Sequence, residues 1–283
     1  MKKLRLAILF IFLLGALFSL HYYRTRSVQT ETIQFHSNLI GKTLPYIAIL
    51  PQNYSFVLAR NKRYPVVYLL HGWSGHFDSW EKNTGLVHYA AEHQLIIITP
   101  EGNNGWYTDS ASNTTDKYET YILQELIPDV DSRFRTIAQR QGRGVIGFSM
   151  GGYGALKFGF KHPEAFSFVA SMSGALDGPA RMDDQSILQT FGEINSVQRK
   201  DNDVLALAAN VPAEQVNQLP YFYFDCGRYD PWLKVNQRFA EILRAHNIRF
   251  EFHEVPGNHT WTYWDQRLPQ VLGTASAAMS AKK

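Results

Sequence analysis

The chain passes from a strand into a helix at a single serine flanked by glycines, and this junction constrains the fold more than any other feature. The strand-like run "RGVI" leads into "GFSMGGYGALKFGF". Ser149 lies between Gly147 and Gly151, and a turn this tight leaves almost no room for side chains at those two positions. We also expect Gly152 and Gly154 to let the helix pack closely on a sheet. The pattern predicts a strained serine at a helix N-terminus, where the helix dipole favours negative charge.

Strand-like and helix-like runs alternate along the rest of the chain. We predict strands over residues 64–72, 95–102, 144–148, 166–174, 221–227 and 250–257, and helices over residues 77–93, 118–134, 150–161, 232–246 and 261–279. Pro128 is expected to kink or end its helix. Two amphipathic runs, 32–37 and 44–51, fit an antiparallel hairpin at a sheet edge. The sequence therefore predicts an α/β fold, with a mostly parallel central sheet and helices on both faces.

One segment is too long to be an ordinary connection between a strand and a helix. Residues 177–220 begin with the polar run "DGPARMDDQS" and continue with the helical run "DNDVLALAAN". Such an insertion fits a small cap over an active site, with a solvated excursion as the alternative. No linker, charge run or repeat divides the remainder, so we predict one domain over residues 31–283.

A serine needs a base to become a nucleophile, and one histidine lies where a base is expected. His259 is in "PGNHTW", the loop after the last predicted strand. The base in turn needs an acid to orient it. Asp230, in the turn "GRYDPW", can reach across to that loop, whereas Asp225 belongs to the preceding strand and is expected to cap or hold the loop. The chain order Ser149, Asp230, His259 is that of the α/β-hydrolases.

Acyl-transfer chemistry also needs donors for a developing oxyanion. One should be the backbone N–H of Met150, the residue after the serine. The other should come from the loop "HGWSGHFDSW", where Trp73 is the expected donor. We expect His71 to be structural and to hold this loop by a hydrogen bond.

Five ordered motifs resemble one known family. "YLLHGWSGHFDSW", "YETYILQELIPDVDSRFR", "GFSMGGYGALKFGFKHPEAF", "FDCGRYD" and "PGNHTWTYW" are together similar to the esterase D-like α/β-hydrolases, in particular their tributyrin-esterase-like members. The resemblance covers residues 31 to about 272 and implies the same triad and oxyanion donors. It also implies that "GNNGWYTDS" lines the pocket, where Trp106 and Tyr107 would contact substrate. Trp232 is a further candidate, although aromatic residues of this kind fit a core equally well.

These features predict a serine carboxylesterase that forms an acyl-enzyme on Ser149 and hydrolyses short acyl esters, including those of acylated carbohydrates. One alternative is an acyltransferase that uses the same residues. The other is a non-catalytic binding protein of the same fold.

Residues 1–30 are predicted to be a targeting segment. The basic start "MKKLR" precedes the apolar run "LAILFIFLLGALFSL", residues 6–20. A cleaved signal peptide and a membrane anchor through residues 6–23 both fit, because no A-x-A site follows and "YYR" is typical of a membrane interface. Either way we expect an exported protein that is periplasmic, secreted or anchored at the outer face of the cytoplasmic membrane. A cytosolic glutathione thioester substrate, used by one branch of the resembled family, is then not expected.

Charge, cysteine content and residue spacing argue against several other classes. The chain has 28 basic and 25 acidic residues, and five of the basic residues but none of the acidic ones lie in residues 1–30. The remainder therefore has 28 − 5 = 23 basic and 25 acidic residues. That balance gives no electrostatic case for a nucleic-acid partner. The single cysteine, Cys226, cannot form an internal disulfide and is expected to be buried. No His/Asp/Glu cluster has metal-ligand spacing, so neither a metal nor a cofactor is expected. The sequence does not indicate an oligomeric state.

Overall fold

The computed structural model describes residue 15 and residues 28–52, 54–55, 59–181 and 185–280. Within these residues the central element is an eight-stranded sheet of order β1-β4-β6-β5-β7-β8-β9-β10. Its strands are β1 (Gln29–Ile33), β4 (Tyr46–Leu50), β5 (Val66–Leu70), β6 (Ile96–Pro100), β7 (Arg143–Phe148), β8 (Phe168–Met172), β9 (Tyr221–Gly227) and β10 (Phe250–Val255). The strand β4 is antiparallel to both neighbours, and the other pairs are parallel. The predicted mostly parallel sheet is confirmed.

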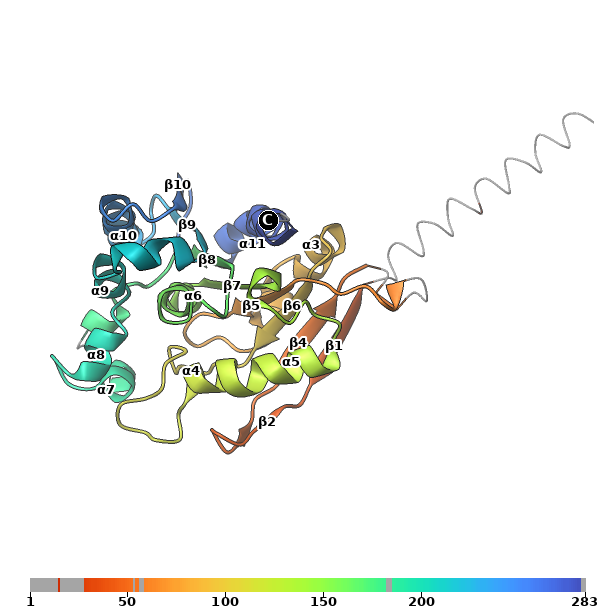
Figure 1. Ribbon diagram of the computed structural model, residues 1–283, viewed down its shortest axis with the longest axis horizontal. Helices are drawn as coiled ribbons and strands as arrows, with labels where there is room; N and C mark the ends of the chain where they lie inside the picture. Colours follow the sequence, from red (N-terminus) through yellow and green to blue (C-terminus); the bar gives the residue numbers. More distant parts are fainter. Residues whose placement is uncertain (1–14, 16–27, 53, 56–58, 182–184, 281–283) are drawn as a thin grey trace, which may run out of the picture.

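Both faces of the sheet are covered, so alternate side chains of a central strand enter different cores. In β5, Val66, Tyr68 and Leu70 belong to one core, and Val67 and Leu69 belong to the other. The first core includes residues of α4 (Tyr118–Tyr121), α5 (Ile127–Arg133), α6 (Met150–Lys161), α9 (Val204–Ala209) and α10 (Leu233–Ala245). The second includes residues of α2 (Ser79–Asn83), α3 (Leu86–Glu92) and α11 (Trp261–Ser280). Figure 1 shows α3 and α11 on one side of the sheet and α4 and α5 on the other.

The N-terminal strands pair as predicted but are placed differently. β1 and β4 are antiparallel. The predicted strand 32–37 is divided, because β1 ends at Ile33 and a separate small hairpin follows, made of β2 (His36–Ser37) and β3 (Lys42–Thr43). β4 is not an amphipathic edge strand. It lies between β1 and β6 and is buried at every residue, which suits the apolar sequence "YIAIL".

The predicted helix 77–93 is two helices, α2 and α3. The chain breaks at Gly85, whose N–H donates to Asp265 Oδ1 of α11 at 2.8 Å. The break therefore serves a contact with a helix 180 residues away, which a local pattern cannot reveal.

The predicted helix 118–134 continues through Pro128 instead of ending there. A π-helical turn, Ile122–Leu126, joins α4 to α5, and the Ile127 N–H bonds to the Ile122 carbonyl five residues earlier. The proline then falls in the first turn of α5, where a missing N–H costs little. The expected kink is therefore replaced by one widened turn.

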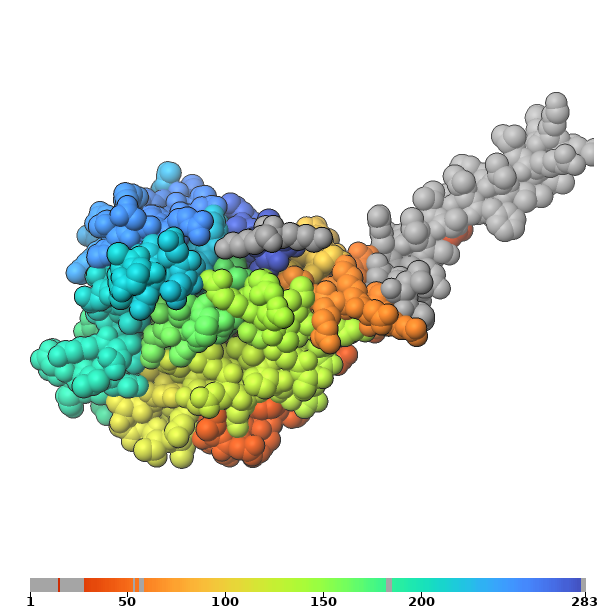
Figure 2. Space-filling view, in the orientation of Figure 1, coloured from red at the N-terminus to blue at the C-terminus, as the bar shows by residue number. Residues whose placement is uncertain are grey.

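The long segment 177–220 contains several short helices. These are the 3₁₀ turn Gly178–Ala180, α7 (Gln185–Phe191), α8 (Val197–Asp201), α9 and the 3₁₀ helix Ala213–Gln218. The helix predicted near residues 201–210 is present as α9, which lies against α6 and α10. The Arg199 guanidinium bonds to the carbonyls of Pro179, Arg181 and Gly192 and ties the segment together. Figure 2 shows α7 and α8, in blue-green, at one end of the molecule.

No helix in the described part of the chain is long and apolar enough to cross a membrane. The apolar run predicted to target the chain, residues 6–20, lies outside the described residues apart from residue 15.

Candidate active site

The serine lies on a sharp turn between β7 and α6. Ser149 is the N-cap of α6, with φ 53° and ψ −120°, a conformation that non-glycine residues rarely adopt. A Cβ at Gly147 would lie 2.2 Å from the Gly151 carbonyl oxygen, and one at Gly151 would lie 2.4 Å from the Leu70 carbonyl oxygen. Both positions therefore require glycine, as predicted, and the serine is held at the carboxyl end of a central strand.

The next two glycines of α6 meet different partners. A Cβ at Gly152 would lie 2.5 Å from Ser171 Oγ in β8, so this glycine does allow close packing on the sheet. A Cβ at Gly154 would lie 2.7 Å from the Tyr107 ring. The prediction that Gly154 lets the helix pack closely on the sheet is wrong, because this glycine makes room for a side chain from the loop after β6.

Three loops bring the predicted serine, histidine and aspartate together. His259 Nε2 lies 3.0 Å from Ser149 Oγ, and His259 Nδ1 lies 2.9 Å from Asp230 Oδ2. These residues follow β7, β9 and β10 at the same edge of the sheet. The imidazole is 26% exposed and the aspartate side chain is fully buried, so the histidine can be reached from solvent while the carboxylate cannot.

The surroundings of Asp230 fix the orientation of the imidazole. Asp230 Oδ1 accepts the Trp232 N–H at 2.9 Å, and the Asp230 N–H donates to the Gly227 carbonyl at 3.1 Å. The Trp264 ring packs edge-on against the His259 ring, with centroids 4.9 Å apart. A carboxylate only accepts, so Nδ1 carries the proton and Nε2 is free to accept the Ser149 hydroxyl proton.

Asp225, the alternative acid, has other partners. It is fully buried and accepts hydrogen bonds from the Tyr263 hydroxyl at 2.7 Å and from Arg267 Nε at 3.0 Å. Burial raises the pKa of Asp225 above its ordinary value, although Arg267 opposes the shift. These contacts tie β9 to α11, so Asp225 holds a helix to the sheet, whereas the sequence suggested that it caps or holds the loop.

Two backbone N–H groups predicted to be oxyanion donors make no hydrogen bond to an acceptor in the described part of the chain. They belong to Met150, the first residue of α6, and to Trp73, in the loop after β5. His71 stabilises this loop as expected: its Nδ1 lies 2.8 Å from the Gly72 carbonyl oxygen, and its Nε2 accepts the Gly102 N–H at 2.9 Å.

The predicted pocket residues Trp106 and Tyr107 are not available to a ligand. Tyr107 is fully buried and donates its hydroxyl to the His71 carbonyl at 3.0 Å. Trp106 is 4% exposed. A Cβ at Gly178 would lie 2.3 Å from the Trp106 ring, and one at Gly154 would lie 2.7 Å from the Tyr107 ring, so the two rings fill spaces that glycines leave. Both rings therefore support the loop from inside the protein instead of facing solvent, as the predicted contact with substrate would require.

The predicted aromatic residue Trp232 does lie near the histidine, and two other aromatic side chains are exposed. The Trp232 and His259 ring centroids are 6.5 Å apart, and the Arg181 guanidinium lies 5.5 Å from the Trp232 ring. Trp73 is 50% exposed and Tyr229 is 76% exposed. Of the predicted substrate-binding residues, Trp232 is the one that lies near His259.

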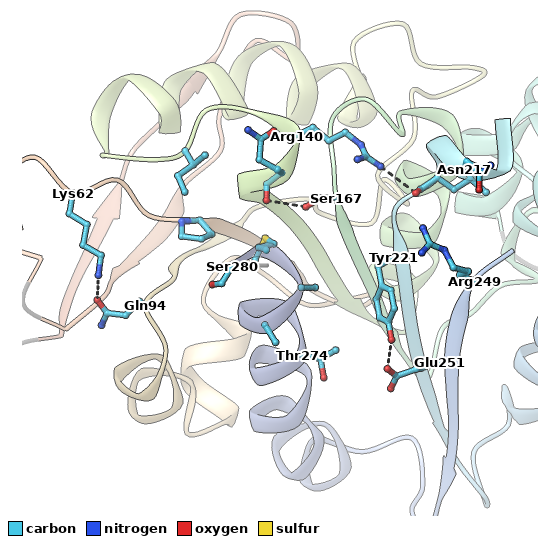
Figure 3. A pocket seen from close by; sticks show the side chains of 17 residues that line it. Lys62, Gln94, Arg140, Ser167, Asn217, Tyr221, Arg249, Glu251, Thr274 and Ser280 are labelled. Carbon is cyan, nitrogen blue, oxygen red and sulfur yellow. Dashed lines mark hydrogen bonds between the residues drawn. The ribbon is translucent and has the colours of Figure 1, made fainter. Parts of the chain in front are cut away.

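A separate hollow lies at the opposite edge of the sheet, beside the amino ends of the parallel strands (Figure 3). Lys62 and Gln94 bond across one side of it, and Tyr221 and Glu251 bond across the other. None of its lining residues is a histidine. Within the described residues, no group of three or more His, Cys, Asp or Glu side chains could hold a metal ion.

Comparison with known proteins gives consistent matches over most of the chain. A family described as "Putative esterase" matches residues 37–275. An acetyl esterase of Caldicellulosiruptor saccharolyticus is 26% identical over 257 residues, which is 85% of this chain and 95% of that protein. A fluorophosphonate-binding serine hydrolase of Staphylococcus aureus superposes with a TM-score of 0.79 at 27% identity, over 88% of this chain and 99% of its own. A ferulic acid esterase gives 0.79 at 25% identity, over 89% and 99%. The family match includes all three loops that meet at Ser149.

Proposed function

Because the chain belongs to the putative esterase family and is a carboxylic ester hydrolase, we propose that Ser149 is its nucleophile, His259 its general base and Asp230 the acid that orients the base. The continuous hydrogen-bonded series from Asp230 through His259 to Ser149 carries this proposal. Acyl transfer also requires hydrogen-bond donors for the oxyanion, and the unpaired N–H groups of Met150 and Trp73 supply them.

In the first half of the reaction, His259 Nε2 takes the hydroxyl proton of Ser149 as Oγ attacks the ester carbonyl carbon. The carbonyl oxygen becomes an oxyanion that accepts hydrogen bonds from the Met150 and Trp73 N–H groups. His259 then returns the proton to the departing alkoxide, which leaves as the alcohol. An acyl-enzyme remains on Ser149.

In the second half, a water molecule gives a proton to His259 Nε2 and attacks the acyl carbon. The same two N–H groups stabilise the second oxyanion. When it collapses, the bond to Ser149 Oγ breaks and His259 returns the proton to Oγ. The carboxylic acid leaves and the enzyme is restored.

We propose short acyl esters of carbohydrates as the substrates. The acetyl esterase and ferulic acid esterase relatives support an ester of this kind. The exposed rings of Trp73 and Tyr229, with Trp232 beside His259, offer apolar faces with polar edges, which suit a sugar ring.

Acyl esters of increasing chain length, tested beside acetylated and feruloylated sugars, examine this proposal. We expect kcat/KM to be highest for the acylated sugars and the free acid to be the main product. A main product that is a new ester, formed with dilute added alcohol or sugar, would instead identify an acyltransferase.

We also propose that residues 1–30 direct the catalytic domain out of the cytoplasm. The basic start and the apolar run of residues 6–20 support this, and an extracellular site suits an enzyme for carbohydrate esters.

A further inference from the structure

Trp73, whose backbone N–H is the second proposed oxyanion donor, lies in a tight turn after β5. Trp73 and Ser74 are the central residues of a turn closed by the Gly75 N–H, which donates to the Gly72 carbonyl at 3.0 Å. Ser74 has φ 58°, whereas Trp73 is not among the residues with positive φ. A negative φ followed by a positive one defines a type II turn, whose fourth-to-first hydrogen bond is present here.

The type II form is unfavourable for this sequence on its own. Its third position favours glycine, and a serine there prefers the type I turn, in which φ is near −90°. The two forms differ mainly by rotation of the central peptide, here the Trp73–Ser74 peptide, through about 180°. Something outside the turn must therefore select the observed form.

Asn104 makes the contact that does so. Its side-chain Oδ1 accepts the Ser74 N–H at 2.7 Å. This N–H belongs to the central peptide, so it would point to the other side of the turn in the type I form and the bond would be lost. The Asn104 bond thus stabilises only the type II form.

The segment that carries Asn104 is itself firmly held. Glu101, 5% exposed, accepts the Asn103 N–H at 2.7 Å through Oε1. Its Oε2 accepts the Phe77 N–H at 3.2 Å and lies 3.3 Å from His76 Nδ1. Glu101 therefore links residues 101–104 to the far end of the same loop that contains Trp73.

We infer that Asn104 is a positioning residue for the oxyanion hole: by accepting the Ser74 N–H, it keeps the Trp73–Ser74 peptide from flipping beside the Trp73 N–H, which belongs to the preceding peptide and is the donor for the reacting carbonyl. This inference rests on the proposed function. A flipped peptide would reverse the N–H and C=O dipoles directly beside the Trp73 donor, and a misplaced donor stabilises the transition state less.

The test replaces Asn104 by leucine, which has a similar shape and no acceptor. We expect Asn104→Leu to lower kcat/KM for p-nitrophenyl acetate about 10- to 100-fold. The Ki of a methyl trifluoromethyl ketone should rise by the same factor, because its tetrahedral adduct places an oxyanion in the same hole. The melting temperature should change little.

Two variants separate positioning from general damage. Asn113→Leu is the matched control, because Asn113 is also exposed and its Oδ1 accepts a backbone N–H, that of Thr115 at 3.1 Å. It should leave kcat/KM and Ki unchanged. Adding Ser74→Gly to Asn104→Leu should restore most of the loss, because glycine adopts φ 58° without the external bond.

Ser149→Ala distinguishes failure of the inference about Asn104 from failure of the proposed function. If Ser149→Ala is inactive while Asn104→Leu behaves like Asn113→Leu, the inference about Asn104 is wrong and the proposed function stands. A loss in Asn104→Leu that Ser74→Gly does not reduce, with Ki unchanged, would also reject the inference. If Ser149→Ala keeps its activity, the proposed function itself fails.

Discussion

Asp230 and Asp225 are five positions apart, yet one contacts the histidine and the other contacts α11. Asp230→Asn should lower kcat/KM by about 10⁴, because an amide can hold the wrong imidazole tautomer. It should change the free energy of unfolding little. Asp225→Asn should instead lower that free energy by about 3 kcal/mol, because Arg267, 15% exposed, loses its charged partner.

Kinetics and urea unfolding of both variants check this pair of expectations. A larger loss of kcat/KM per folded molecule in Asp225→Asn than in Asp230→Asn would move the acid to position 225.

Residue type and chain order were enough to predict which serine, aspartate and histidine meet. A tight strand-to-helix turn admits few residue types, and the loops after the last strands end at the same edge of the sheet. Burial of single aromatic residues could not be predicted in this way. Trp106 and Tyr107 are buried because Gly178 and Gly154, distant in the chain, leave room for them. The role inferred for Asn104 also depends on a contact between two loops, which no motif reveals.

At the scale of helices, two glycines in α6 and α11 should respond oppositely to the same change. A Cβ at Gly151 would lie 2.4 Å from the Leu70 carbonyl oxygen, whereas one at Gly273 would have its nearest neighbour, His93 Cε1, at 3.7 Å. Gly151→Ala should displace α6 from β5 and abolish activity. Gly273→Ala should raise the free energy of unfolding by about 0.5–1 kcal/mol, because alanine favours a helix.

Thermal and urea unfolding, together with kcat/KM, test both glycine variants. An active Gly151→Ala enzyme of unchanged stability would contradict the packing described for the turn at Ser149.

A buried ion pair joins α4 to α6 beside the loop that carries Tyr107. Lys157 Nζ lies 2.6 Å from Glu119 Oε2, and Glu119 also contacts Lys161 and His162. Burial lowers the pKa of Lys157 to about 8, although Glu119 opposes the shift. Burial alone would raise the pKa of Glu119, but Lys157, His162 and Lys161 outweigh it and leave that pKa well below its ordinary value.

The pKa of Glu119 gives this pair a defined pH dependence. Because folding lowers the pKa, the carboxylate stabilises the protein fully above the ordinary glutamate value of 4.5, and this contribution is lost as the pH falls below it. The difference in unfolding free energy between the native protein and Glu119→Gln should therefore be largest near pH 7 and shrink below about pH 4.5. The matched control is Glu164→Gln, whose side chain is 73% exposed; it should show almost no difference at any pH. A constant difference for Glu119→Gln across this range would contradict the assignment.

Elements were predictable where the local pattern was strong. The continuous apolar runs gave the parallel strands, because strands covered on both faces have few polar residues. The prediction of one helix over residues 77–93 was wrong at Gly85, where the helix is interrupted and the backbone N–H donates to Asp265 of α11. The prediction that Pro128 kinks or ends the helix was also wrong. The π-helical turn before it places the proline in the first turn of α5, where its missing N–H costs little.

At the scale of the whole molecule, the proposed export of the chain can be tested in cells. If residues 1–30 target the chain, the full-length protein should hydrolyse a membrane-impermeant ester added to intact cells. A chain that begins at residue 28 should remain in the cytoplasm, with kcat/KM unchanged after purification, because β1 starts at Gln29. Cell fractionation followed by kinetics checks both expectations. Full-length protein found only in the cytoplasm would reject the export proposal.

The sheet as a whole explains why three distant residues form one site. Ser149, Asp230 and His259 follow parallel strands, and parallel strands end at the same edge. The alternation of strands and helices predicted the parallel sheet. The order of its strands could not be predicted in the same way, because it depends on contacts across the whole chain.

The most direct test of the account is to locate the covalent adduct formed with a fluorophosphonate. Intact-protein and peptide mass spectrometry should find one phosphonyl group, on Ser149, with esterase activity lost in proportion to labelling. Ser149→Ala should stay unlabelled, with kcat lowered by about 10³- to 10⁶-fold. An adduct on another residue, or Ser149→Ala with native activity, would contradict the account.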